Sequence, residues 1–225
     1  MKCNFILYAL VYLIFVFAGF GCSGNKTTDD FIKETISNNF EDKGEFILLS
    51  SYPILADQKK AFIANVNFTG QGRNFSQVAL LIFEESKHAE EMGCSYATPI
   101  NEELVEMVSS ASGQGTYELE RRLSYYDSGH WTSIHTAHSS SNEGYGCCPP
   151  NGVGCDVKVI ESNWYYREDR FTGKQKLLET TSILSYNLNY DDEISNKKKE
   201  VSCKIFIIDG RSIKQTETVL NSTAQ

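Results

Sequence analysis

The spacing of apolar residues changes along the chain, and the change separates expected helices from expected strands. An apolar stripe between Phe31 and Phe40 has helical spacing and follows Thr28, a good N-cap, so it predicts a first helix. Apolar positions recur every three or four residues over 101–111 as well, which predicts a second helix. A short third helix is expected over 84–92.

Strands are expected where apolar and polar residues alternate. Three of them, at 45–50, 60–68 and 77–83, follow the first helix. From Gly115 onward the period is two, and short turns join successive apolar runs, which predicts an antiparallel meander. Its six strands are expected at 117–125, 131–138, 157–167, 176–190, 201–208 and 212–220.

The long strand at 176–190 offers a choice of buried face. Leu178, Leu184 and Tyr186 lie on one side, and Glu179 and Asn187 lie on the other. We therefore expect the leucine side to be buried.

These elements together predict an α+β fold. We expect a large, mainly antiparallel sheet with two or three helices, mostly N-terminal, covering one face. Residues 29–225 are expected to form a single domain, with lobes at 29–112 and 113–225 as the alternative division.

The N-terminus has the layout of a secretory signal. Lys2 precedes an apolar run from Phe5 to Phe20, which is about 16 residues and shorter than the roughly 20 that span a bilayer as a helix. Gly21-Cys22 follows, and this ending resembles a bacterial lipoprotein signal. The resemblance implies that residues 1–21 are removed, that Cys22 is lipidated, and that residues 22–28 form a tether. Plain secretion with cleavage at the same bond and an uncleaved anchor are the alternatives.

The resemblance places the protein in the cell envelope, at the outer membrane or cell surface, with the membrane as a partner through its lipid. Ser23 after the cysteine is similar to an outer-membrane sorting residue. The formal net charge of −8 argues against nucleic acid as a partner. Four Asn-x-Ser/Thr sites, at 25, 67, 74 and 221, keep a secreted glycoprotein as a further reading.

Cysteine usage is consistent with an oxidising compartment. Five cysteines are candidates for disulfides: Cys94, Cys147, Cys148, Cys155 and Cys203. We expect Cys155 to bond Cys147 or Cys148 across a short Pro/Gly-rich spacer, and the other of this pair to bond Cys94 or Cys203. An unlipidated Cys22 would bring the number to six, and all could then pair.

Two segments carry candidate chemistry. His130, His135 and His138 suggest a metal site, but on one strand His135 faces away from the other two, so surface or strand histidines are the better interpretation. The loop at 144–155 is expected to be a connection that a disulfide closes. Tyr145 within it is a candidate recognition residue.

No residue pattern indicates catalysis or a cofactor, so we expect no cofactor. The nucleophile elbow, the phosphate-binding glycine loop and the dinucleotide fingerprint are all absent from the sequence. The leading prediction is a non-enzymatic binding or structural module whose partner is an envelope protein or a hydrophobic ligand. A carrier is the second hypothesis, because a curved meander closed by a helix is similar to the half-barrel of lipoprotein-localisation carriers. A hydrolase whose site cannot be seen in the sequence is the third.

Overall fold

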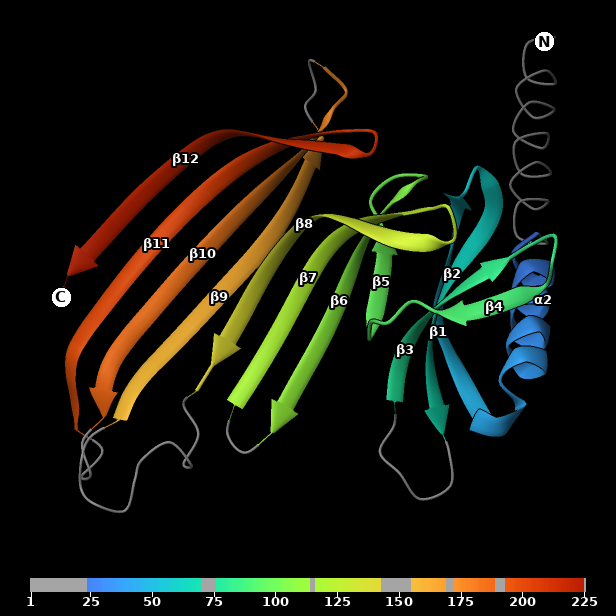
Figure 1. Cartoon of the computed structure of the whole chain (residues 1–225), viewed down its shortest axis with the longest axis horizontal. Coiled ribbons are helices and arrows are strands. Elements are labelled where there is room, and N and C mark those ends of the chain that lie inside the picture. The colour runs from blue at the N-terminus through green and yellow to red at the C-terminus, as the bar shows by residue number, and fades with distance from the viewer. Residues whose placement is uncertain are drawn as a thin grey trace, which may run out of the picture.

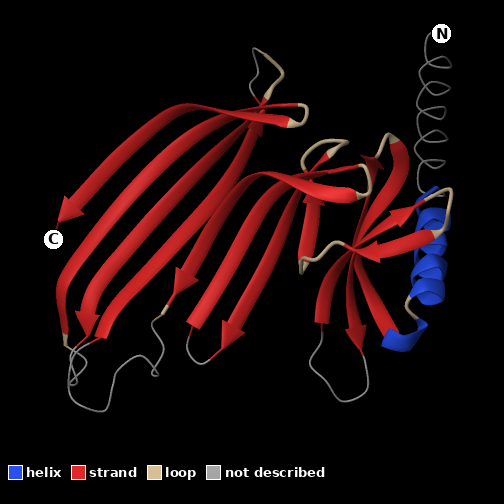
Figure 2. Cartoon of the chain, in the orientation of Figure 1, coloured by secondary structure: helices blue, strands red, loops and turns tan. Residues whose placement is uncertain are grey.

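The described part of the chain forms two antiparallel sheets that lie side by side, with one α-helix against the smaller sheet (Figures 1 and 2). The structure is a computed structural model and describes residues 24–69, 76–113, 116–142, 155–168, 172–188 and 193–224. The smaller sheet follows α2 (Gly24–Asn39) and the 3-10 helix η1 (Glu41–Lys43), and its strands are β1 (Glu45–Ala56), β2 (Lys59–Thr69), β3 (Ser76–Phe83) and β4 (His88–Glu91). The larger sheet contains β5 (Tyr96–Pro99), β6 (Leu104–Gly113), β7 (Thr116–Asp127), β8 (His130–Ser141), β9 (Cys155–Glu168), β10 (Gln175–Leu188), β11 (Ile194–Asp209) and β12 (Ser212–Ala224).

Neighbours in the sequence are neighbours in each sheet. The four-stranded sheet has the order β1-β2-β3-β4, and the eight-stranded sheet runs from β5 to β12 without a crossover. Six strands form at the predicted positions, as β7 to β12, but the predicted six-stranded meander is wrong, because β5 and β6 extend the same sheet to eight strands. Asp209 and Gly210 lie at the turn between β11 and β12, and Gly210 has a φ of 57°, which glycine adopts without steric cost.

Helix α2 covers one face of the four-stranded sheet, as its apolar stripe predicted. Ile32 and Ile36 are fully buried against Val66 and Leu80. Thr35 is buried in the same stripe, where its hydroxyl donates to the Phe31 carbonyl at 2.9 Å. The helix begins at Gly24, so Thr28, the predicted N-cap, lies inside it, and packing on the sheet stabilises the helix.

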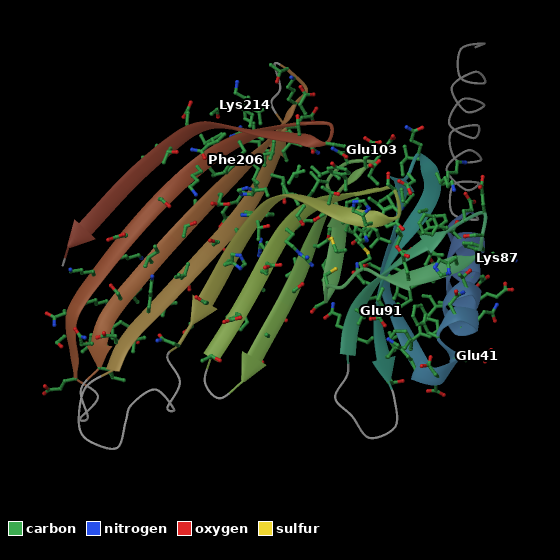
Figure 3. All side chains as sticks on the ribbon, in the orientation of Figure 1. Glu41, Lys87, Glu91, Glu103, Phe206 and Lys214 are labelled. Carbon is green, nitrogen blue, oxygen red and sulfur yellow. The ribbon has the colours of Figure 1, made fainter. Side chains whose placement is uncertain are left out.

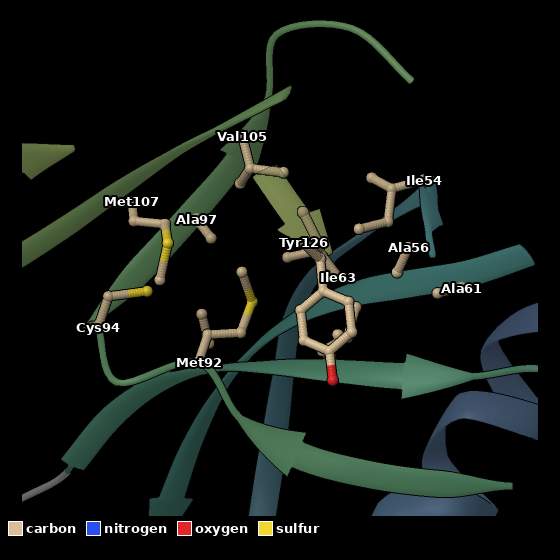
Figure 4. Close-up of a cluster of buried hydrophobic side chains, with 12 residues drawn as sticks. Ile54, Ala56, Ala61, Ile63, Met92, Cys94, Ala97, Val105, Met107 and Tyr126 are labelled. Carbon is tan, nitrogen blue, oxygen red and sulfur yellow. The ribbon is translucent and has the colours of Figure 1, made fainter. Parts of the chain in front are cut away.

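The opposite face of the four-stranded sheet packs against β5, β6 and the β7–β8 hairpin (Figure 4). Ile63 meets Val105 and Met107 of β6 there, and Tyr126 packs edge-on against Trp131. This layer is an apolar contact that joins the two sheets.

A buried asparagine joins the sheets by imitating a backbone strand. Asn65 on β2 is fully buried, and its Nδ2 donates to the Ala97 carbonyl at 2.8 Å while its Oδ1 accepts from the Ala97 amide at 2.8 Å. Its Nδ2 also donates to Ser50 Oγ at 2.9 Å. One side chain thus satisfies both backbone groups of a residue in β5, on the other sheet.

The eight-stranded sheet curls so that its two ends approach each other. Leu104 on β6 and Phe206 on β11 share one apolar cluster, although four strands separate them in the sheet. Arg211, in the β11–β12 turn, donates to Asp127 at 3.1 Å and to Glu103 at 2.9 Å. Figure 1 shows the upper ends of β11 and β12 bending towards the β7–β8 hairpin, and Figure 3 places Phe206 and Glu103 at this upper end. We call the face inside this curl the inner face.

Within the curl, β8 and β9 separate along most of their length. These strands pair only at Ser140–Ile160 and Ser141–Val159. At the next position Ser139 Oγ accepts from the Ser162 amide at 2.8 Å, so a side chain replaces the backbone ladder. Beyond this fork, side chains fill the space between the two strands.

The predicted α+β fold is wrong, because the described chain is mostly β with a single α-helix. The second predicted helix, over 101–111, is strand β6. Leu104 packs on the inner face, whereas Val105 and Met107 pack against the four-stranded sheet, so both faces of β6 are buried at its start. Apolar residues on both faces of a strand give a spacing that resembles a helix. The third predicted helix, over 84–92, is a turn followed by the short strand β4.

The predicted buried face of β10 is also wrong. Leu177 is fully buried and Glu179 is only 4 % exposed, whereas Leu178 and Leu184 are half-buried on the other side. The register sets Glu179 opposite Trp164 and Lys204, which explains why a carboxylate is accommodated inside.

We expect Leu177→Ala to lower the free energy of unfolding by about 2–5 kcal/mol, because it leaves a cavity in the inner cluster. Leu178→Ala, one residue along, is the matched control and should cost clearly less. Denaturant unfolding of both variants measures the difference, and equal costs would contradict the assigned face.

We expect Asn65→Ala to cost about 2–4 kcal/mol, because the amide and carbonyl of Ala97 would both lose their buried partner. Asn163→Ala removes an exposed asparagine from β9 and should be nearly neutral. Thermal and denaturant melts distinguish the two variants. If Asn65→Ala lowers the free energy of unfolding no more than Asn163→Ala does, the hydrogen bonds of Asn65 do not stabilise the fold.

Candidate functional site

A buried carboxylate lies at the centre of the inner face. Glu179 on β10 has a side chain only 5 % exposed, and three donors from three other strands surround it. His135 Nε2 on β8 donates to Oε2 at 2.7 Å, Trp164 Nε1 on β9 donates to Oε2 at 3.1 Å, and Lys204 Nζ on β11 donates to Oε1 at 3.4 Å. We call these four residues the Glu179 cluster.

Aromatic rings enclose the imidazole of this cluster. The His135 ring stacks on the Trp164 ring, with centroids 5.3 Å apart. The centroid of the Phe206 ring lies 4.6 Å from that of His135. The His135 side chain is 18 % exposed. The cluster is therefore largely closed to solvent and spans the fork between β8 and β9.

The surroundings of Glu179 favour its ionised form. Burial raises the pKa of this carboxyl, but hydrogen bonding and electrostatic attraction from His135, the Lys204 ammonium and the Trp164 indole together outweigh it. The net pKa lies below its ordinary value. Glu179 is thus a buried carboxylate with its charge compensated.

A second acid group lies on the same face, nearer the four-stranded sheet. Arg121 Nη1 on β7 lies 3.5 Å from Glu106 Oε1 on β6. Burial raises the pKa of Glu106, and the neighbouring Tyr166 hydroxyl and Arg121 partly oppose that rise. Burial, reinforced by the charge of Glu106, raises the pKa of the Tyr166 hydroxyl, which stays protonated.

The Glu179 cluster and the group around Glu106 have geometries that suit a structural role better than a catalytic one. The hydroxyls that come next along the inner face, Ser162 and Thr181, lie 3.1 Å apart and pair with each other. His135 has its Nε2 bonded to a carboxylate and its ring covered by Trp164 and Phe206, an arrangement that favours fixed geometry over proton transfer to a substrate.

The three histidines do not converge. His138 Nδ1 lies 3.6 Å from Glu120 Oε2, beside an open groove of about 470 Å³ on the outer face of β6, β7 and β8. His130 is exposed at the start of β8, with Nδ1 3.2 Å from the Ser128 carbonyl. Among the residues that the structure describes, no group of three or more His, Cys, Asp and Glu could hold a metal ion.

The cysteines occupy separate environments. Cys94 is buried between the sheets, and burial raises the pKa of its thiol to about 11. Cys203 is half-buried on the outer face of β11. The strand register places Cys155 opposite Leu188 and Cys203 opposite Thr180, eight residues apart along β10 and thus about 26 Å. A bond between Cys155 and Cys203 is therefore sterically excluded.

Several predicted residues fall outside the described part of the chain. These are Cys22, Tyr145, Cys147 and Cys148, and at Cys155 the structure describes the backbone only. The lipidation, the recognition loop and the Cys155 pairing remain predictions.

Sequence reasoning identified His135 but not its partners. Alternation along 176–190 predicts an exposed Glu179, and no sequence pattern singles out Trp164 or Lys204. The only signal was Leu177-Leu178, which puts apolar residues on both faces of one strand, so alternation alone could not choose between them.

The sequence matches no protein-family model and no curated protein, and no solved structure matches the chain. No helix in the described residues has the length and apolar character needed to cross a membrane.

We expect Glu179→Gln to lower the free energy of unfolding by about 1–3 kcal/mol at pH 7, because three donors would lose a charged acceptor. Since the folded pKa of Glu179 is lowered, its stabilisation is present above the unfolded pKa of about 4.5 and is lost as pH falls through the folded value. The gap between the native protein and the variant should therefore be widest above about pH 5 and close below it.

Denaturant melts between pH 3 and pH 7 measure this gap. Glu161→Gln, at an exposed glutamate of β9, is the matched control. A gap that stays constant with pH would contradict the lowered pKa, and a gap equal to that of the control would show that the cluster does not stabilise the sheet.

Proposed function

We propose that the protein is an exported, lipid-anchored and non-enzymatic binding module that acts in the cell envelope. The N-terminal resemblance to a lipoprotein signal supports the location. The arrangement of the eight-stranded sheet supports the binding role, because one of its faces is filled while the other is open over β9 to β12.

The open face is the observation that carries the proposal. On its outer side, Tyr165, Leu178 and Ile205 lie directly across from one another on β9, β10 and β11. Cys203 and Val219 form the next apolar pair, on β11 and β12. Tyr165 is 57 % exposed and Val219 is 50 % exposed, and the other three are half-buried. We call these five residues the outer patch, and neighbouring apolar side chains that reach the surface are typical of protein-contact surfaces.

The inner face gives less support to the other two hypotheses. A carrier of hydrophobic ligands needs an apolar concavity that is open, whereas the upper inner face is filled by Leu104, Leu123, Trp164 and Phe206. The helix that was expected to close a half-barrel covers the other sheet instead. A hydrolase needs an acid–base group that a substrate can reach, whereas His135 is enclosed by aromatic rings.

The partner we infer is an envelope protein that presents an apolar segment. The outer patch offers an aromatic anchor in Tyr165 with aliphatic neighbours, and aromatic side chains are enriched at protein contact sites.

A photo-reactive phenylalanine analogue placed at position 165 tests this role in the intact envelope. We expect it to form a discrete protein adduct, and Val219→Lys in the same chain should weaken that adduct by about tenfold, which corresponds to a loss of about 1.4 kcal/mol.

The matched control carries the same analogue at Tyr117, which is 42 % exposed but lies on the inner face of β7. No adduct at position 165, or the same adduct at both positions, would show that the outer patch is not the contact surface.

A further inference from the structure

A hollow of about 380 Å³ lies at one end of the four-stranded sheet. Pro53 and Leu55 of β1 and Phe62 of β2 line it together with Lys60, and Glu84 and Glu102 flank its sides. Its volume falls within the range of sites that hold small ligands. Neither the Glu179 cluster nor the outer patch includes any of these residues.

The hollow opens on the face of the sheet that α2 covers. The register pairs Pro53 with Phe62 and Leu55 with Lys60, so these four residues share one face. Phe62 packs beneath the helix, with its ring 6.1 Å from that of Phe31. The hollow is therefore a continuation of the helix–sheet interface beyond Phe31.

The start of α2 extends to the same level. The helix runs along β2 from Phe40, which contacts Phe68, to Phe31, which contacts Phe62, so its N-terminal end points towards Lys60. Gly24 lies seven residues before Phe31, about 10 Å further along the axis. Leu55 lies two residues beyond Pro53, about 7 Å further along β1. The first turn of the helix thus lies at the height of the hollow.

The chemistry of the lining selects an apolar occupant. Leu55 and Phe62 are only half-buried, so both present apolar surface that a hydrocarbon could cover. Lys60 lies across from Leu55 on the same face, and Glu84 and Glu102 add two carboxylates to the lining. Cys22, the residue predicted to be lipidated, precedes the first residue of α2 by two positions. Two residues of chain reach at most about 7 Å, so a hydrocarbon attached to Cys22 is within reach of the first turn of α2.

We propose that this hollow binds one acyl chain of the lipid attached to Cys22. The proposal rests on the lipid anchor in the proposed function. A chain held there leaves the remaining acyl chains to hold the bilayer, and it fixes the four-stranded sheet, not the outer patch, next to the membrane. Since a single chain gives only marginal membrane binding, moving one chain between the hollow and the bilayer would change the strength of anchoring.

The test begins with the full chain purified from its own membrane. Mass analysis of the N-terminal peptide reports whether Cys22 carries acyl groups. An unmodified Cys22 would overturn the lipid anchor and this inference with it.

The second measurement uses the acylated protein with a diazirine residue at position 55. Irradiation should produce a peptide that joins residue 55 to the acyl group on Cys22. The same diazirine at Leu178, a half-buried leucine of the outer patch, is the control and should give no such product. With Cys22 acylated, a missing product at position 55, or equal yields at both positions, would overturn the hollow as the binding site and leave the anchor intact.

A third measurement is independent of the cross-link. The unacylated Cys22→Ser chain should bind one equivalent of a fluorescent long-chain fatty acid, and Leu55→Gln should weaken this binding by at least about tenfold. Leu184→Gln, at a half-buried leucine of β10 outside the outer patch, is the control and should leave it unchanged. Thermal melts establish that both variants are folded. Absence of binding by Cys22→Ser, or equal effects of the two glutamine variants, would overturn the proposal.

Discussion

One buried carboxylate holds the eight-stranded sheet together where its backbone pairing is interrupted. Glu179 binds donors from β8, β9 and β11, and these strands lie on both sides of the fork. Removing a carboxylate from water is costly unless hydrogen bonds and opposite charge compensate it, and here His135, Trp164 and Lys204 do so. The curl that brings Arg211 to Asp127 depends on this cluster, because only two residue pairs connect β8 to β9 by their backbones.

Local patterns predicted the elements that have one buried face. The α2 stripe records contact with a single core, and that prediction is confirmed. Strand β2 forms as predicted, but its alternation does not mark one buried face, because Ile63 and Asn65 are buried on the side opposite Val66. Strand β6 could not be predicted in this way, because Leu104 serves one core while Val105 and Met107 serve another. Its amphipathic appearance reflects two layers of tertiary structure, which no window of the sequence contains.

The same limit applies to the functional surfaces. A glutamate in a strand is normally exposed, and the burial of Glu179 follows from the register that sets it beside Trp164 and Lys204. The outer patch likewise depends on which side of β10 the curl encloses. Alternation identifies the two faces of a strand, but which face is buried depends on the elements that pack against the strand.

The neighbour-only order of the two sheets has a consequence for how the molecule forms. Every strand from β6 to β12 can pair with one that has already been made, and no strand has to wait for a partner further along the chain. Loop closure then costs little at each step, in contrast to β folds built on distant pairings. A polypeptide that emerges N-terminus first can therefore assemble hairpin by hairpin, and β12, the last strand, completes the sheet as it arrives.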